Sequence, residues 1–190
     1  VTRFSVLALM LVSVFTSRAQ YVTIPDANFI TWLNTHGYSG CLSGNQLDTT
    51  CSTVLNTHGL YTTGTGIYNF TGLQYFKNLD TLDCSRDSLQ LIPSFPATLK
   101  YLNCGYNFMG SLPALPASLT YLSCEHNGLG SLPALPPGVS QVNCSFNQLN
   151  TLPALPTALT LIYCNYNFLS SLPSLPAHLV TIDCSNNSSI

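Results

Sequence analysis

Hydrophobic and polar positions repeat every 20 residues along most of this chain, as from Cys84 to Cys104. In residues 112–131, which read LPALPASLTYLSCEHNGLGS, leucine and cysteine occupy the apolar slots, and polar or aromatic residues separate them. Six cysteines keep this register: Cys84, Cys104, Cys124, Cys144, Cys164 and Cys184. A second ladder follows three residues after each cysteine: Asp87, Asn107, Asn127, Asn147, Asn167 and Asn187. A fixed period of this length predicts a repeat protein whose units stack on one another.

Each unit predicts one short strand and an irregular return path. Leu122 and Cys124 alternate with outward-facing residues, as a strand with one buried face requires. Because so short a unit cannot enclose a core, the copies must stack in parallel, at roughly 4.8 Å per strand. The two prolines of a unit, such as Pro113 and Pro116, preclude a regular helix on the return path and favour polyproline-II backbone. An asparagine at the turn can bond backbone groups that the bend leaves unpaired, so its repetition predicts a ladder.

These segments resemble a known family. The sequence LTYLSCEHNGL resembles the leucine-rich repeat, and LPALPASL resembles its short bacterial type, over residues 79–187. The resemblance implies an α/β-type leucine-rich repeat solenoid used for recognition, with a parallel β-sheet on the concave face and irregular backbone on the convex side. Upstream, YVTIPDANFITWL and TGLQYFKNL are similar to the N-terminal region of Bacteroidetes-type secreted and cell-surface repeat proteins.

Residues 1–19 have the pattern of a secretory signal peptide. Arg3 precedes an apolar run over residues 4–15, and Ser17 and Ala19 provide small residues at cleavage positions. We therefore expect a secreted or cell-surface protein, in a compartment where disulfides form.

Residues 20–75 and 76–190 are predicted to form two further regions. The first is a small N-terminal cap, whose helix begins near Asp26 and ends at Gly37. A second short helical turn is expected from Cys51 to about Asn56. The second region is the solenoid, with about six repeats.

The last repeat ends without a second proline-containing half. We therefore expect a truncated C-terminus that lacks a capping unit, since solenoids need polar terminal repeats. The sequence then predicts that Ile182 and Cys184 are more exposed than their counterparts one repeat earlier, Ile162 and Cys164.

The eight cysteines fall into two groups. Cys41 and Cys51 lie outside the ladder in a polar loop, which predicts a disulfide. For the six ladder cysteines, zinc ligation requires thiolates that converge on one point, whereas a ladder is a line. Disulfides between rungs would require the parallel Cβ atoms to approach to about 3.8 Å. A role as small buried hydrophobic residues is the favoured interpretation.

Composition excludes several classes of function. Only 6% of the residues are charged, against about a quarter in typical soluble domains. Beyond residue 19 the basic residues are Lys77, Arg86 and Lys100, too few for the cationic surface that nucleic acids require. No apolar run reaches the roughly 18 residues of a transmembrane helix.

Catalysis has one sequence candidate, the cluster of Cys124, Glu125 and His126. Strand alternation turns Cys124 inward and its neighbours outward, so thiol and imidazole cannot share a proton. We expect no catalytic residue, no cofactor and no bound metal.

Outward aromatic residues form the candidate ligand-binding surface. Successive repeats place them in a band on the concave face: Tyr101, Tyr106, Tyr121, His126, Phe146, Tyr163 and Tyr166. Exposed aromatic patches are typical of binding sites, which predicts recognition of a protein or glycan ligand. Alternatively, the rings pack on one another and tile a structural or adhesive surface element that has no specific ligand.

Overall fold

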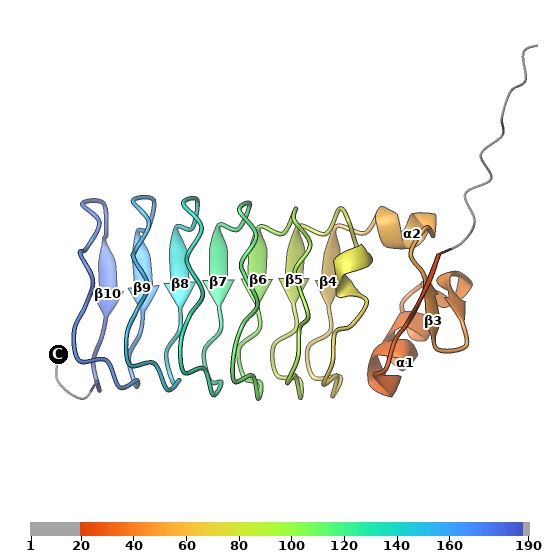
Figure 1. Cartoon of the computed structure of the whole chain (residues 1–190), viewed down its shortest axis with the longest axis horizontal. Helices are drawn as coiled ribbons and strands as arrows, with labels where there is room; N and C mark the ends of the chain where they lie inside the picture. Colours follow the sequence, from red (N-terminus) through yellow and green to blue (C-terminus); the bar gives the residue numbers. More distant parts are fainter. Residues whose placement is uncertain (1–19, 188–190) are drawn as a thin grey trace, which may run out of the picture.

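Every predicted repeat forms one short strand of a parallel sheet in the computed structural model, which describes residues 20–187 (Figure 1). The sheet has seven strands in the order β10-β9-β8-β7-β6-β5-β4. Their bounds are β4 Gly59–Tyr61, β5 Thr81–Asp83, β6 Tyr101–Asn103, β7 Tyr121–Ser123, β8 Gln141–Asn143, β9 Leu161–Tyr163 and β10 Thr181–Asp183. The predicted fold class, a leucine-rich repeat solenoid with a parallel sheet, is confirmed. The predicted signal peptide lies outside the described residues.

The return segments are irregular, as the prolines predict. After the short 3₁₀ helix η2, Leu73–Tyr75, no helix occurs in the described chain up to residue 187. The middle residue of each strand from β4 to β9 is fully buried: Leu60, Leu82, Leu102, Leu122, Val142 and Ile162. Parallel pairing sets each of these residues beside its equivalent in the next strand, so the core is a continuous apolar column.

The sheet begins earlier than the expected boundary between residues 75 and 76. β4 pairs in parallel with β5, and Leu60 and Thr62 occupy the slots that Leu82 and Cys84 hold one rung later. The sequence hides this rung because the interval from Leu60 to Leu82 is longer than the regular interval from Leu82 to Leu102, and because threonine replaces cysteine.

The cap combines helices with a small sheet. Its elements are β1 Tyr21–Thr23, α1 Ala27–Thr35, the 3₁₀ helix η1 Ser39–Cys41, β2 Leu42–Ser43, β3 Gln46–Asp48 and α2 Ser52–Leu55. Both helices lie where they were expected, but the antiparallel sheet β1-β3-β2 was not foreseen. Its strands have two or three residues, too few for alternation to be visible in the sequence. A disulfide joins Cys41 to Cys51.

Asp26 fastens this cap to the solenoid. One carboxylate oxygen accepts hydrogen bonds from the backbone N–H groups of Asn28 and Phe29, at 2.8 and 3.0 Å, and caps α1. The other accepts from the N–H groups of Tyr68 and Asn69, at 2.6 and 2.9 Å. The carboxylate is fully buried, so it fixes the position of the helix against the first turns of the solenoid.

The asparagine ladder satisfies the turn after each strand. The Asn147 amide donates to the carbonyls of Cys124, Cys144 and Ser145, at 3.0, 3.1 and 3.2 Å. Its oxygen accepts from the backbone N–H of Leu129 at 3.1 Å. One buried side chain therefore joins two successive rungs. Among the described residues, no buried side-chain nitrogen or oxygen lacks a hydrogen-bond partner.

The six ladder cysteines are free thiols, and all except Cys184 are buried. Burial raises the pKa of Cys84, Cys104, Cys124 and Cys144 well above the usual range, and it raises the pKa of Cys164 to about 12. Cys184 and Ile182 are only partly buried, whereas Cys164 and Ile162 are fully buried, which is the predicted difference in exposure. Among residues 20–187, no helix has the length and apolar character needed to cross a bilayer.

Replacing Asn147 with alanine should lower the free energy of unfolding by at least about 3 kcal/mol, because three carbonyls and one N–H lose a buried partner. Urea denaturation measures this loss. Asn187→Ala is the matched control: it removes the same kinds of bond in the partly exposed last rung, where water can replace them. Equal losses at both positions would contradict a role for burial.

The alkylation of each ladder cysteine should depend on its burial. Because the thiolate is the reactive form, iodoacetamide in mildly alkaline buffer should modify Cys184 first and the five buried cysteines only upon unfolding. Intact-mass spectrometry in native buffer and in urea gives the count. Rapid modification of all six cysteines in the native protein would show that the column is open to solvent.

Candidate functional site

Parallel register aligns equivalent residues of successive repeats into rows on the sheet side of the solenoid. The first and third residues of each strand face outward, and their partners in the next strand lie directly beside them. Three residues beyond each strand, a further outward row is formed by Arg86, Tyr106, His126, Phe146, Tyr166 and Asn186. We call this last row the stacked row.

The stacked row has an unusual backbone. All six of its residues have left-handed conformations, with φ between 50° and 57°. This region costs roughly 1–2 kcal/mol for an ordinary L-residue, and asparagine is among the few that adopt it readily. Asn186 and His126 follow that local preference, whereas Arg86, Tyr106, Phe146 and Tyr166 do not. The aromatic residues of the row are therefore held there by forces between neighbouring repeats, among them hydrogen bonds of 2.8–3.0 Å from their backbone N–H groups to carbonyls of the next repeat.

Ring stacking provides one such force. Tyr106 and His126 have ring centroids 4.3 Å apart, His126 and Phe146 4.0 Å, and Phe146 and Tyr166 4.3 Å, with interplanar angles of 11–15°. The Arg86 guanidinium lies 4.9 Å from the Tyr106 ring centroid. Inside the row each ring face is covered by the next, so the rings present mainly edges to solvent.

The other predicted contact residues lie elsewhere on the sheet. Tyr101 and Tyr121 form a separate stack in the first strand row, at 4.4 Å and 5°. Burial, with smaller contributions from Tyr121 and nearby acidic groups, raises the pKa of Tyr101 to about 12. Tyr163 belongs to the third strand row and is 36% exposed. The seven predicted residues thus occupy three neighbouring rows, which together make up the predicted band.

Two exposed aromatic residues were missed in the sequence. Phe108 and Phe168 follow the asparagine ladder and are 70% and 55% exposed. The equivalent positions in other repeats hold Ser88, Gly128 and Gln148, so the slot is outward and normally polar or small. That contrast is the signal that could have identified both phenylalanines.

A depression of about 430 Å³ lies between Phe108 and the stacked row. His126 and Phe146 line it from the stacked row, and Gly110 and Gly128 contribute only backbone. Asn107 and Asn127 complete its lining.

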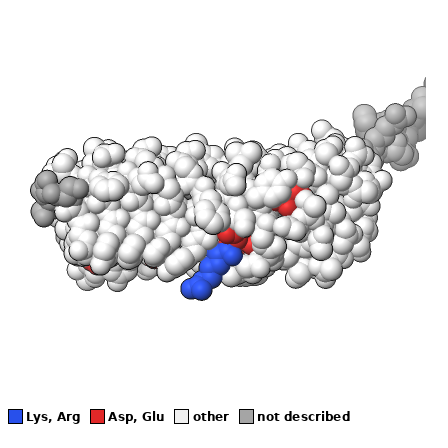
Figure 2. Space-filling model, turned by 90° about the horizontal axis from the view of Figure 1, so that it is seen from below, with Lys and Arg blue, Asp and Glu red and all other residues white. Residues whose placement is uncertain are grey.

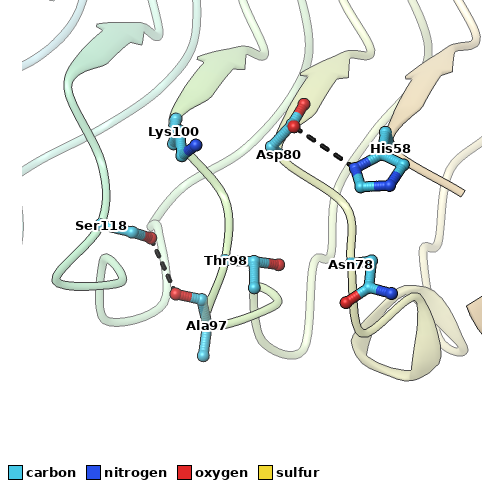
Figure 3. Close-up of a pocket in the computed structure, with 7 residues that line it drawn as sticks. All are labelled: His58, Asn78, Asp80, Ala97, Thr98, Lys100 and Ser118. Carbon is cyan, nitrogen blue, oxygen red and sulfur yellow. Dashed lines mark hydrogen bonds and ion pairs between the residues drawn. The ribbon is translucent and has the colours of Figure 1, made fainter. Parts of the chain in front are cut away.

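A second depression, of about 340 Å³, lies where the chain enters β4 to β6 (Figure 3). His58 Nδ1 and Asp80 Oδ2 are 3.5 Å apart at its rim, and Lys100 follows one repeat later. The hydroxyls of Thr98 and Ser118 donate to backbone carbonyls of the preceding repeat, so they serve the fold. This depression was not anticipated from the sequence.

Charge is concentrated next to the cap. Within the described chain, the basic residues Lys77, Arg86 and Lys100 all fall in residues 77–100. From residue 101 to residue 187 the acidic residues are Glu125 and Asp183, and lysine and arginine do not occur. Figure 2 shows a face on which acidic and basic atoms meet near the middle and most of the remaining surface carries no charge.

The candidate catalytic cluster has the geometry expected from alternation. Cys124 is fully buried, and burial raises the pKa of its thiol, whereas Glu125 and His126 are partly exposed. Glu125 Oε2 accepts a hydrogen bond from the Asn143 amide at 2.8 Å. In the part of the chain that the structure describes, no group of three or more His, Cys, Asp or Glu side chains could hold a metal ion.

Substitutions at Phe146 can separate backbone strain from ring contacts. Phe146→Ala and Phe146→Asn both remove the stacked ring, but asparagine adopts the left-handed region more easily. The asparagine variant should therefore be more stable than the alanine variant by about 1 kcal/mol in urea denaturation. Equal stability would mean that the backbone of this row is not strained.

Comparison with known proteins agrees with this geometry. No protein-family model and no curated protein matches the chain. A solved Shigella effector leucine-rich repeat domain is 31% identical, with a TM-score of 0.66, over 70% of this chain and 60% of that one. YopM, a leucine-rich effector from Yersinia pestis, is 32% identical, with a TM-score of 0.66, over 70% of this chain and 38% of its own length. YopM from Yersinia enterocolitica is 33% identical, with a TM-score of 0.52, over 60% of this chain and 30% of that one.

The chain therefore spans less than two thirds of each of these structures. The seven-stranded parallel sheet, the repeated ladders and these matches together identify the chain as a leucine-rich repeat solenoid similar to bacterial leucine-rich repeat effector proteins.

Proposed function

We propose that this chain is a recognition module that binds a protein ligand through the aromatic rows on the sheet side of the solenoid. The observation that carries the proposal is the stacked row, in which aromatic residues occupy a left-handed backbone position that suits asparagine better. Strained residues held in place by their surroundings cluster at functional sites. The proposal assigns no catalytic step.

A protein ligand suits these rows better than a glycan. Sugars bind aromatic side chains through the ring faces, and here the faces of His126 and Phe146 are covered by their neighbours. Ring edges, an apolar surface and few charges match the core of a protein interface, where aromatic residues are enriched and charged residues are depleted. The similar Shigella and Yersinia structures are effector proteins, and recognition of another protein would accord with that class.

We place the protein outside the cytoplasm, secreted or at a cell surface. The Cys41–Cys51 disulfide in the cap supports this location, because such bonds persist in oxidising compartments. The signal-peptide pattern in residues 1–19 and the N-terminal similarity to Bacteroidetes-type repeat proteins point the same way.

Tyr166→Asn tests the proposal. Tyr166 ends the stack and is 48% exposed, and asparagine is the natural residue at this slot one repeat later, Asn186. Peptides selected from a displayed random library against the whole chain serve as the probe. Their affinity should fall about tenfold or more in the variant, as is typical when an aromatic contact residue of an interface is removed.

The matched control is Tyr21→Asn, which removes an equally exposed tyrosine from β1 of the cap. It should leave peptide affinity unchanged. If Tyr166→Asn lowers the melting temperature and peptide affinity stays intact, the row is structural tiling. In that case a passive structural or adhesive surface element is the better description.

A further inference from the structure

We infer that the depression beside Gly128 is an anchor site that takes one aromatic side chain of the bound protein. The inference rests on the proposed function and adds which chemistry the ligand must offer and where it enters. The site is formed by Gly128, Phe108 and the stacked row.

The depression exists because one side chain is missing. In the row that contains Ser88, Phe108, Gln148 and Phe168, Gly128 is the single glycine. Its backbone does not need glycine, because its φ is not among the positive values. A Cβ atom added there would meet the Met109 carbonyl oxygen at 3.6 Å and Gln148 Nε2 at 3.9 Å, which are ordinary contacts. The fold would accept a side chain at this position. Because the residue is glycine, the space remains open and forms the depression.

The walls of this space are aromatic. Phe108 is 70% exposed, and its ring has no stacked ring partner among the described residues, so most of its surface is open to solvent. His126 and Phe146 offer the edges of the stacked row to the same space. Offset-stacked and edge-to-face contacts are the arrangements that aromatic pairs prefer. A ring inserted between these walls can make both kinds.

The two asparagine side chains of the lining are already engaged in hydrogen bonds. The Asn127 amide donates to the carbonyls of Cys104, Cys124 and Glu125, and its oxygen accepts from Met109 N–H. Asn107 makes the equivalent four bonds one repeat earlier. His126 is then the one side chain of the lining whose polar atoms do not serve the ladder. A sugar placed here would lose hydrogen bonds to water with few replacements, whereas an apolar aromatic ring would lose none.

Two glycine substitutions give a matched pair. Gly128→Gln fills the depression with the residue found one repeat later, Gln148, so the backbone is known to accept it. Gly130→Gln makes the same chemical change two residues away, at a position outside the lining where an added Cβ meets nothing within 4 Å. Gly128→Ser, which copies Ser88 of an earlier repeat, replaces Gly128→Gln if the latter has a lowered melting temperature.

The full chain is titrated with p-cresol, the side-chain analogue of tyrosine, and separately with methyl N-acetyl-β-D-glucosaminide, while ¹H–¹⁵N correlation spectra are recorded. We expect saturable shifts of the Gly110 and Gly128 amides with p-cresol alone. These shifts should persist in Gly130→Gln and disappear from the Gly110 amide in Gly128→Gln. Absence of saturable shifts in the wild-type chain, or shifts with the sugar instead, would overturn the inference.

The library-selected peptides separate this inference from the proposed function. We expect an aromatic residue in each peptide and a loss of affinity of about tenfold in Gly128→Gln, with no loss in Gly130→Gln. If Tyr166→Asn weakens the peptides and Gly128→Gln does not, the recognition surface stands and the anchor site is refuted. If neither variant weakens them, the proposed function itself fails.

Discussion

The structure depends on the satisfaction of backbone polar groups at the turn that follows each strand. The strands of the solenoid are so short that strand pairing alone leaves many N–H and C=O groups of the bend without partners. One asparagine per repeat supplies four hydrogen bonds at this point, to its own repeat and to the preceding one. The apolar column can then remain dry, and the cysteine thiols inside it stay protonated. The ladder also fixes the turn on which the left-handed residues of the stacked row lie.

The sequence was informative where one physical requirement recurs in every repeat. Leu122, Cys124 and Asn127 each meet a demand that stacking imposes identically on all units, so their regular register predicted the parallel sheet. The repeated prolines predicted the helix-free return path. The first rung was missed because β4 pairs with β5 across a longer interval than the later strands and carries Thr62 in the cysteine slot. The cap sheet was missed because strands of two or three residues show no alternation.

The outer surface was harder to predict for a related reason. No single packing requirement applies to the outward-facing residues of all repeats. The contacts of each outward residue depend on its neighbours in adjacent repeats, which are known only from the three-dimensional structure. Tyr163 and Tyr166 were placed in one aromatic band, and the structure sets them in two neighbouring rows of it. The burial of ring faces within the stacked row, and the space left by Gly128, both arise from contacts between repeats. The sequence of a single repeat therefore does not reveal these contacts.

The first position of the asparagine ladder has the opposite hydrogen-bond polarity. Asp87 accepts from Thr62 Oγ1 and from the backbone N–H groups of Thr65 and Gly66, whereas each asparagine donates to three carbonyls. Near-identical repeats could otherwise slip by one unit during folding, since the apolar column would look the same after a shift. A slipped chain would lose the hydrogen bonds that the backbone N–H groups of Thr65 and Gly66 donate to the Asp87 carboxylate. One substitution in an otherwise uniform ladder thus defines its origin, and the number of repeats between the cap and any surface residue is fixed.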